Sequence, residues 1–282
     1  MAKYQKLNTA GKKAFWKENP LNGNIEIKLD DFPSFSMYCE NDDTVIKELY
    51  WTNWKGWENT SLALWANLLS QIQGGLILDI GSYTGIYAII AAELNPSSSI
   101  YAFDIQEECI NRIKKNLSLN DISNVSLKLA ACTNTNGTQK FYYYSEEGII
   151  SSVAGIVPKK MNNLSKEITS IRLDDFLSES SKEIPLKLLK MDVEGGEQET
   201  LKGLASTIVR DKPDMLIEIN NSTDLKEVKK LIPKAYNVYD IDEDKLELMR
   251  LGFFNKPSKH RNYLFSVKSK KDLGKIFKGQ IR

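Results

Sequence analysis

The sequence has few of the features that mark secreted, membrane-spanning or metal-stapled proteins. Its three cysteines, Cys39, Cys109 and Cys132, are scattered and form no CxxC pair, which argues against a disulfide framework and a cysteine zinc site. The N-terminus lacks the apolar stretch of a signal peptide. The apolar run from Ile86 to Ala92 is far shorter than the ~20 residues that a membrane span requires. We therefore expect a cytoplasmic protein without a membrane span.

An excess of charge of either sign is also missing. The 282 residues include 38 Lys and Arg against 37 Asp and Glu, which gives a formal net charge of +1. This balance gives no support for a strongly electrostatic nucleic-acid binder, so we expect no nucleic-acid partner. No motif indicates an oligomeric state.

Apolar segments of two kinds alternate from residue 76 onward. Short buried-strand patterns cover residues 76–80, 100–103, 125–131, 186–193, 215–219, 236–241 and 263–267, with 140–144 as an additional candidate. Helical patterns cover residues 86–95, 107–119, 197–209 and 224–231. Strands that alternate with helices predict an α/β fold with a mostly parallel, doubly wound, seven-stranded sheet. Such sheets bind ligands at the carboxyl ends of their strands.

The first expected strand ends in a glycine-containing turn, Asp79-Ile80-Gly81-Ser82-Tyr83-Thr84-Gly85, and a helix follows. The dinucleotide fingerprint G-x-G-x-x-G fails at Tyr83 and Ile86. A carboxylate at Asp79 would also repel a pyrophosphate. S-adenosylmethionine (SAM) instead carries an ammonium, a sulfonium and one carboxylate, which suits an acid beside free turn amides. The turn therefore favours SAM over a dinucleotide.

An acid also ends the second expected strand, at Asp104. A carboxylate at this position can accept both ribose hydroxyls of an adenosine. Ala130 and Ala131, at the end of the third strand, could flank the adenine. The competing interpretations are that Asp79 only caps the next helix and that Asp104 is a solvated strand end. Their common register with the glycine turn favours nucleoside binding.

The turn resembles the first motif of class I methyltransferases, which have a Rossmann-like fold. Residues 189–197, Leu-Lys-Met-Asp-Val-Glu-Gly-Gly-Glu, followed by Leu201-Lys202-Gly203, resemble the signature of the FkbM family of methyltransferases. Residues 57–60 (Trp-Glu-Asn-Thr), 173–177 (Leu-Asp-Asp-Phe-Leu) and 214–219 (Asp-Met-Leu-Ile-Glu-Ile) agree with that family. The resemblance implies SAM as the methyl donor and a hydroxyl of a sugar, polyketide or other small metabolite as the acceptor. The sequence departs from the family pattern at Tyr83, where Asn is usual, at Ser82, where Ala is usual, and at Asp104, where Glu is more common.

The resemblance also suggests a division of the chain and a set of site residues. We expect an N-terminal extension or cap (1–57), a SAM-dependent methyltransferase domain (58–268) and a basic C-terminal tail (269–282). The predicted cofactor-binding residues are Glu58, Asp79, Gly81, Tyr83, Gly85, Asp104, Ile105, Ala131 and Asp192.

Three acids follow the fourth and fifth expected strands, whose ends should face the ligand crevice. Asp192 and Glu194 follow the fourth strand, and Glu218 ends the fifth. They are candidates for the base that deprotonates a hydroxyl, and Asp192 with Glu218 could instead hold Mg²⁺. Glu197 is more typical of a helix cap.

Other interpretations remain open. His260, the only histidine, lies between Lys259 and Arg261, a setting more typical of a surface residue than of a base. An RNA ribose methyltransferase is one competing function, and a SAM-fold protein without catalysis is another. The Asn/Asp-Pro-Pro-Tyr/Phe motif of amino-methylating enzymes is absent, because the chain has no Pro-Pro.

Overall fold

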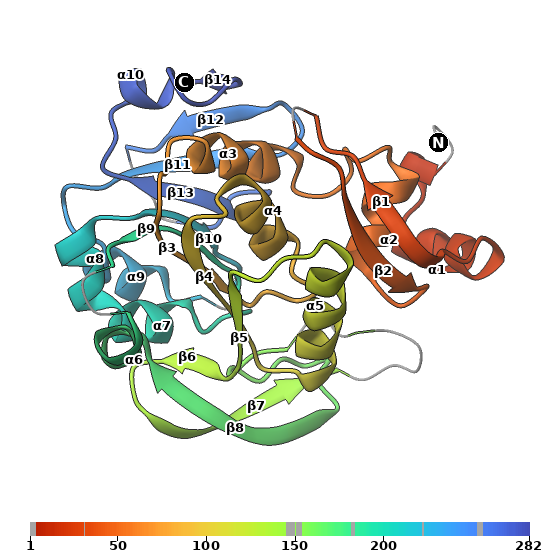
Figure 1. Ribbon diagram of the computed structural model, residues 1–282, viewed down its shortest axis with the longest axis horizontal. Coiled ribbons are helices and arrows are strands. Elements are labelled where there is room, and N and C mark those ends of the chain that lie inside the picture. The colour runs from red at the N-terminus through yellow and green to blue at the C-terminus, as the bar shows by residue number, and fades with distance from the viewer. Residues whose placement is uncertain are drawn as a thin grey trace.

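The computed structural model describes residues 4–30, 32–144, 150, 154–181, 184–221, 223–252 and 256–282. The chain begins with an extension that carries its own small sheet (Figure 1). Its elements are η1 (Tyr4–Lys6), α1 (Thr9–Glu18), β1 (Asn22–Ile27), β2 (Phe35–Glu40) and α2 (Thr44–Trp51). β1 and β2 pair in antiparallel fashion. The expectation of an N-terminal extension is confirmed.

A nine-stranded sheet, counted over the described residues, forms the centre of the molecule. Its strand order is β14-β12-β11-β13-β10-β9-β3-β4-β5. The strands are β3 (Gly75–Ile80), β4 (Ser98–Asp104), β5 (Val125–Leu129), β9 (Leu186–Met191), β10 (Asp214–Glu218), β11 (Asn237–Asp242), β12 (Glu247–Arg250), β13 (Asn262–Ser266) and β14 (Gln280–Ile281). From β10 to β5 all neighbours are parallel, whereas β13 runs antiparallel to β10 and β11. The predicted seven-stranded, mostly parallel sheet is present, and β12 and β14 extend its edge.

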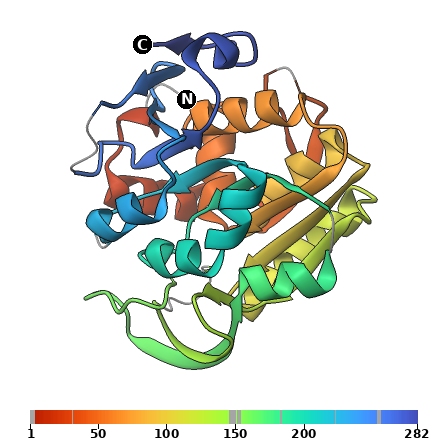
Figure 2. The ribbon, with the colours of Figure 1, turned by 90° about the vertical axis from the view of Figure 1, so that its left-hand side faces the viewer.

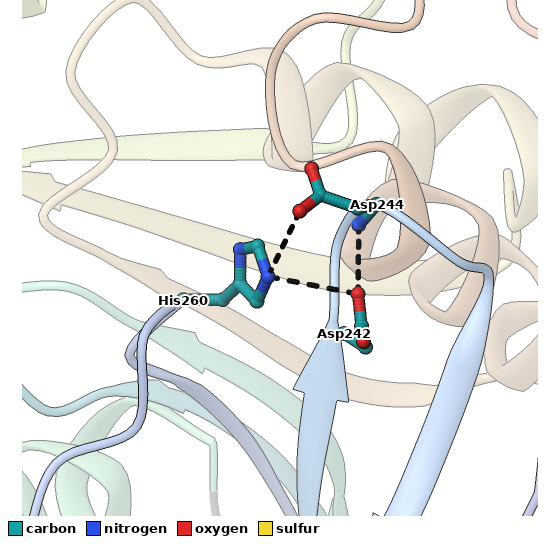
Figure 3. A group of neighbouring side chains, drawn as sticks. All are labelled: Asp242, Asp244 and His260. Atoms are coloured by element: carbon teal, nitrogen blue, oxygen red, sulfur yellow. Dashed lines mark hydrogen bonds and ion pairs between the residues drawn. The ribbon is translucent and has the colours of Figure 1, made fainter.

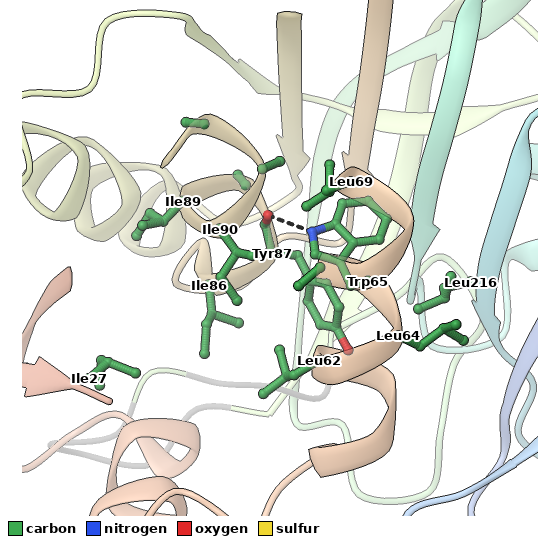
Figure 4. Close-up of a cluster of buried hydrophobic side chains, with 14 of the residues drawn as sticks. Ile27, Leu62, Leu64, Trp65, Leu69, Ile86, Tyr87, Ile89, Ile90 and Leu216 are labelled. Atoms are coloured by element: carbon green, nitrogen blue, oxygen red, sulfur yellow. Dashed lines mark hydrogen bonds between the residues drawn. The ribbon is translucent and has the colours of Figure 1, made fainter. Parts of the chain in front are cut away.

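Helices cover both faces of this sheet, as the strand–helix alternation predicts (Figures 1 and 2). One face carries α3 (Asn59–Leu69), α4 (Ile86–Leu94) and α5 (Glu107–Leu119); the other carries α6 (Leu173–Ser180), α7 (Glu197–Gly203), α8 (Ala205–Asp211) and α9 (Leu225–Leu231). The first face is tightly packed around Trp65, whose indole N–H donates to the Tyr87 carbonyl at 3.1 Å (Figure 4). α4 is apolar on most faces because it is buried between α3 and the sheet.

The N-terminal extension is fixed to α5. The β2 amides of Ser36 and Tyr38 donate to the side chains of Asn120 and Asn116 at 2.7 and 2.8 Å. Arg112 of α5 forms a 2.6 Å ion pair with Asp42, and both side chains are largely buried. The side chains of Asn116 and Asn120 therefore satisfy backbone groups along the free edge of β2. These contacts, with the Arg112–Asp42 ion pair, hold the N-terminal extension against α5.

Two expected elements differ in the structure. The helix expected over residues 197–209 is divided into α7 and α8 at Leu204, whose backbone leaves the helical conformation at φ −114° and ψ 4°. Gly203, the last residue of α7, passes so close to Thr133 that a Cβ at residue 203 would lie 1.9 Å from the Thr133 carbonyl oxygen. The third expected strand, 125–131, divides into β5 and β6 (Ala131–Thr133). β6 joins β7 (Gly137–Tyr143) and β8 (Leu164–Arg172) in a separate three-stranded sheet, and β8 lies outside the expected elements.

The C-terminal segment is also ordered against the sheet. Residues 269–282, expected as a basic tail, contain α10 (Lys270–Leu273) and β14, and β14 pairs with β12. Leu273 and Phe277 are buried. Within the described part of the chain, no helix is both long and apolar enough to cross a membrane.

Candidate active site

A cavity of about 780 Å³ lies at the carboxyl ends of the parallel strands. Most of the predicted site residues line it: Glu58, Gly81, Tyr83, Asp104, Ile105, Ala131, Asp192, Glu194 and Glu218. Asp79 and Gly85 do not. The extension closes one side of the cavity with Thr9, Lys13 and Trp16 of α1 and Thr44, Val45 and Glu48 of α2.

The glycine turn after β3 brings two strand ends into direct contact. Gly81 adopts φ +79°, and a Cβ there would lie 1.7 Å from the Asp192 carbonyl oxygen. The Asp192 amide donates to the Ile80 carbonyl at 2.9 Å. Only a residue without a Cβ fits between these backbones. Gly81 therefore sets the distance between the turn and Asp192.

Asp79 lies behind the turn and is fully buried. Its carboxylate accepts a 3.1 Å hydrogen bond from the Ala88 amide in the first turn of α4. Burial raises the pKa of Asp79 to about 7, although the Lys190 ammonium opposes the shift. This geometry matches the competing interpretation of Asp79 as a helix cap.

Asp104 faces the cavity at the end of β4. One carboxylate oxygen accepts from the Tyr83 amide and the other from the Gln106 amide, both at 2.9 Å. Burial raises the pKa of Asp104 to about 6. Ile105 and Ala131 line the cavity beside it. Two amides thus fix the carboxylate at the position where the sequence predicts the ribose hydroxyls.

Three carboxylates converge where β9 and β10 end. Oxygens of Glu58, Asp192 and Glu218 all lie within 4.8 Å of one another. Burial, followed by the charge of Glu218, raises the pKa of Asp192 well above its ordinary value, and burial also raises the pKa of Glu218. Asp192 Oδ1 is buried without a hydrogen-bond partner among the described residues. These donors suit a hard cation such as Mg²⁺ in type and number.

Two basic side chains form ion pairs with acids of this cluster. Lys190 Nζ lies 3.5 Å from Glu58 Oε2, and Arg261 Nη2 lies 3.3 Å from Glu218 Oε1. Burial disfavours the Lys190 ammonium, but Glu58, Asp192 and Glu218 raise its pKa overall. No motif in the sequence marks Lys190 as a site residue. The available signal was a lysine inside the apolar run Leu188-Leu189-Lys190-Met191.

Glu243 is a second site residue that the sequence analysis missed. Its carboxylate accepts from the Thr60 and Ser61 amides at 2.8 and 3.1 Å, so it caps the start of α3. Asn262 donates to both Glu58 and Glu243 at 3.1 Å. Burial and the Glu58 charge raise the pKa of Glu243 to about 7. The partners lie far apart in the sequence, so no local pattern reveals this contact.

Glu194 and Glu197 follow β9 but differ in environment. Glu194 lines the cavity, forms an ion pair with Lys159 and accepts a 3.2 Å hydrogen bond from the Asn220 amide group. Glu197 is buried and accepts from the Gly195 amide at 2.9 Å and from the Thr223 hydroxyl at 2.7 Å. Glu197 therefore shapes the turn before α7, in keeping with its interpretation as a capping residue.

His260 lines the cavity, in contrast to its interpretation as a surface residue. Its side chain is 16% exposed, and Nε2 lies 3.6 Å from Asp242 Oδ1 and 3.4 Å from Asp244 Oδ2 (Figure 3). Lys245 and Lys259 pair with these two aspartates at 2.9 and 2.6 Å. Histidine enters the cavity wall because β13, which follows it, runs antiparallel and therefore begins beside the end of β10.

A family model described as the methyltransferase FkbM domain matches residues 79–251. The chain belongs to the FkbM methyltransferase family. The matched domain is a methyltransferase domain, and the chain has the Rossmann-like class I fold that the motifs predict. The FkbM match runs from the end of β3 to β12 and includes Asp79, Gly81, Asp104, Asp192 and Glu218.

Similar proteins include two fungal methyltransferases. Methyltransferase 1 of Beauveria bassiana is 28% identical over 143 residues, which cover 45% of this chain and 57% of that protein. Methyltransferase sdnD of Sordaria araneosa is 26% identical over 157 residues, covering 45% and 60%. A ribosomal protein L11 methyltransferase of Porphyromonas gingivalis is 39% identical over 72 residues, covering 26% and 24%. The alignments thus span between a quarter and three fifths of these relatives.

Among solved structures, methyltransferase FkbM from Methylobacillus flagellatus KT is similar at a TM-score of 0.45 and 16% identity. The similarity covers 68% of this chain and 43% of that chain.

Proposed function

We propose that this FkbM methyltransferase transfers the methyl group of SAM to a hydroxyl of a small molecule or a sugar unit. The observation that carries the proposal is the Asp192 carboxylate, which lines the cavity and has one buried oxygen without a partner among the described residues. A hydroxyl acceptor must lose its proton as the O–CH₃ bond forms and the S–CH₃ bond breaks. An unpartnered carboxylate oxygen is suited to receive that proton.

The rest of the cavity supports a neutral, hydroxylated acceptor. The lining also includes Glu48, Asp244 and Arg261 together with Trp16 and Trp57. Hydroxyl groups can donate to the carboxylates, and aromatic rings can pack against a sugar or polyketide face. Glu218 supports Asp192 as its neighbour in the carboxylate cluster.

The chemistry can follow either of two routes. In the first, Asp192 is the general base, and its raised pKa lets it hold the acceptor proton after transfer. In the second, Asp192 and Glu218 hold Mg²⁺, which would stabilise the acceptor oxyanion. We favour the base, because Lys190 and Arg261 already compensate the carboxylates.

RNA ribose methylation is the competing function, because ribose also presents a hydroxyl. The lining argues against it: acids outnumber the basic residues Lys13 and Arg261 around the cavity, and an RNA phosphate would be repelled. The alignments to ribosomal protein L11 methyltransferases cover only about a quarter of those enzymes. They therefore do not indicate the acceptor of this chain.

Incubation of the enzyme with methyl-labelled SAM and a panel of glycosides, polyketide alcohols and RNA tests the proposal. We expect an O-methyl ether of a glycoside or polyketide. Methyl transfer to RNA alone would contradict the proposal. The same assay in EDTA separates the routes: activity that is lost in EDTA and restored by Mg²⁺ indicates a metal, and unchanged activity indicates the base.

A further inference from the structure

Four acids from four separate segments meet at the carboxyl edge of the sheet. Glu58 precedes α3, Asp192 follows β9, Glu218 ends β10 and Glu243 follows β11. Oxygens of Glu58, Asp192 and Glu218 lie within 4.8 Å of one another, and Asn262 donates to both Glu58 and Glu243 at 3.1 Å. Gathering carboxylates this closely without a cation is unfavourable, because like charges repel strongly where water is excluded.

Lys190 is positioned to reduce the repulsion among these carboxylates. It belongs to β9 two residues before Asp192, and since strand side chains alternate, both point to the same side of the strand. Lys190 is 3% exposed, donates to Asn262 Oδ1 at 3.2 Å and lies 5.0 Å above the ring of Tyr87. A buried ammonium is itself costly unless it is paired.

The partners of Lys190 tie it to the acid cluster. Its ammonium is 3.5 Å from Glu58 Oε2, and Asn262, which accepts from Lys190, also donates to Glu58 and Glu243. Tyr87, beneath the ammonium, donates its hydroxyl to Glu58. Lys190 therefore contacts Glu58 directly, and two neutral side chains, Asn262 and Tyr87, join it further to Glu58 and Glu243.

We propose that Lys190, buried where Arg261 is half-exposed, is the resident buried cation of the Glu58–Asp192–Glu218 cluster and takes the place of a divalent metal. This positioning role rests on the proposed function, because it selects the metal-free route for Asp192. The ammonium fixes the Glu58 carboxylate through a charge-assisted contact and lets the acids stay close together. SAM and the acceptor then meet an ordered acid cluster that does not need an added ion.

Titration of the purified enzyme with Mn²⁺ tests this role without any acceptor, so its outcome is independent of the acceptor screen. Lys190→Met keeps the apolar length of the side chain but removes its charge. We expect Lys190→Met to bind Mn²⁺ at least tenfold more tightly than the wild-type enzyme does. We also expect Mg²⁺ to raise the melting temperature of Lys190→Met and to leave that of the wild type unchanged. Glu218→Gln in the Lys190→Met background should remove the gained affinity.

Lys187→Met is the matched control, because Lys187 is exposed on the same strand. It should behave as the wild type does. A folded Lys190→Met variant that gains no Mn²⁺ affinity overturns the proposal. If Lys190→Met does not fold, wild type and Glu218→Gln decide alone: equal, weak Mn²⁺ binding supports the resident cation, and tight wild-type binding that Glu218→Gln abolishes overturns it.

Discussion

Substitution of Gly81 by alanine should disrupt both the fold and the SAM site. The left-handed φ of +79° at Gly81 costs a residue with a Cβ ~1–2 kcal/mol. The new Cβ would lie 1.7 Å from the Asp192 carbonyl oxygen, so the ends of β3 and β9 must separate. Overpacking of this kind costs a further ~1–3 kcal/mol. We expect Gly81→Ala to lower the free energy of unfolding by ~2–5 kcal/mol in all.

Gly23→Ala is the control for this experiment. Gly23 has a similar φ of +98°, but a Cβ there would meet nothing within 4 Å. Gly23→Ala should therefore cost only the backbone term of ~1–2 kcal/mol and leave SAM binding unchanged. Urea unfolding gives the stabilities, and calorimetry gives the SAM affinities. If Gly81→Ala is no less stable than Gly23→Ala and binds SAM as the wild type does, the close approach of the two strand ends is wrong.

Two further predictions concern the buried acids of the cofactor half. Asp104→Ala should weaken SAM binding by ~1.5–3 kcal/mol, because charge-assisted hydrogen bonds to the ribose are lost; unchanged SAM affinity in calorimetry would remove Asp104 from the ribose site. Asp79 binds its proton more tightly in the folded chain, where its pKa is about 7, than in the unfolded chain, where it is near 3.8. The wild type should therefore lose stability relative to Asp79→Asn as the pH rises from about 4 to about 7, by at most about 1.4 kcal/mol per pH unit. A constant difference between the two proteins over that range, measured by urea unfolding, would show that Asp79 does not titrate in this way.

The sequence predicts the sheet well because local patterns carry its information. Apolar strands alternate with helices, and the glycine turn and the acids at the ends of β4, β9 and β10 all mark the carboxyl edge. The division of α7 from α8 escapes prediction, since the helical apolar spacing of Leu201, Leu204 and Ile208 continues through the break at Leu204. β8 and β12 are not predicted because their charged and polar residues obscure the alternation of apolar and polar residues that marks a strand.

The site is less predictable than the sheet because its contacts join distant segments. Asp192 and Glu218 can be placed from strand ends alone, but the position of Glu58 depends on Asn262, 204 residues away. The apolar run around Lys190 indicates that it is buried but does not identify Glu58 as its partner, and His260 reaches the cavity only because β13 runs antiparallel. Asp79 is the opposite case. It belongs to the glycine turn that the sequence places at the cavity, but its carboxylate accepts from the start of α4 and does not line the cavity.

Single-turnover methyl transfer from labelled SAM, in EDTA, by the wild type and by Asp192→Asn tests the central claim most directly. The acceptor is the hydroxylated compound that the panel identifies. We expect an O-methyl product from the wild type, formed ~10²-fold or more slowly by Asp192→Asn, with SAM affinity largely retained. An N- or C-methylated product, or a wild-type rate in Asp192→Asn, would contradict hydroxyl methylation at this carboxylate; in the second case His260 is the next base on the cavity wall to test.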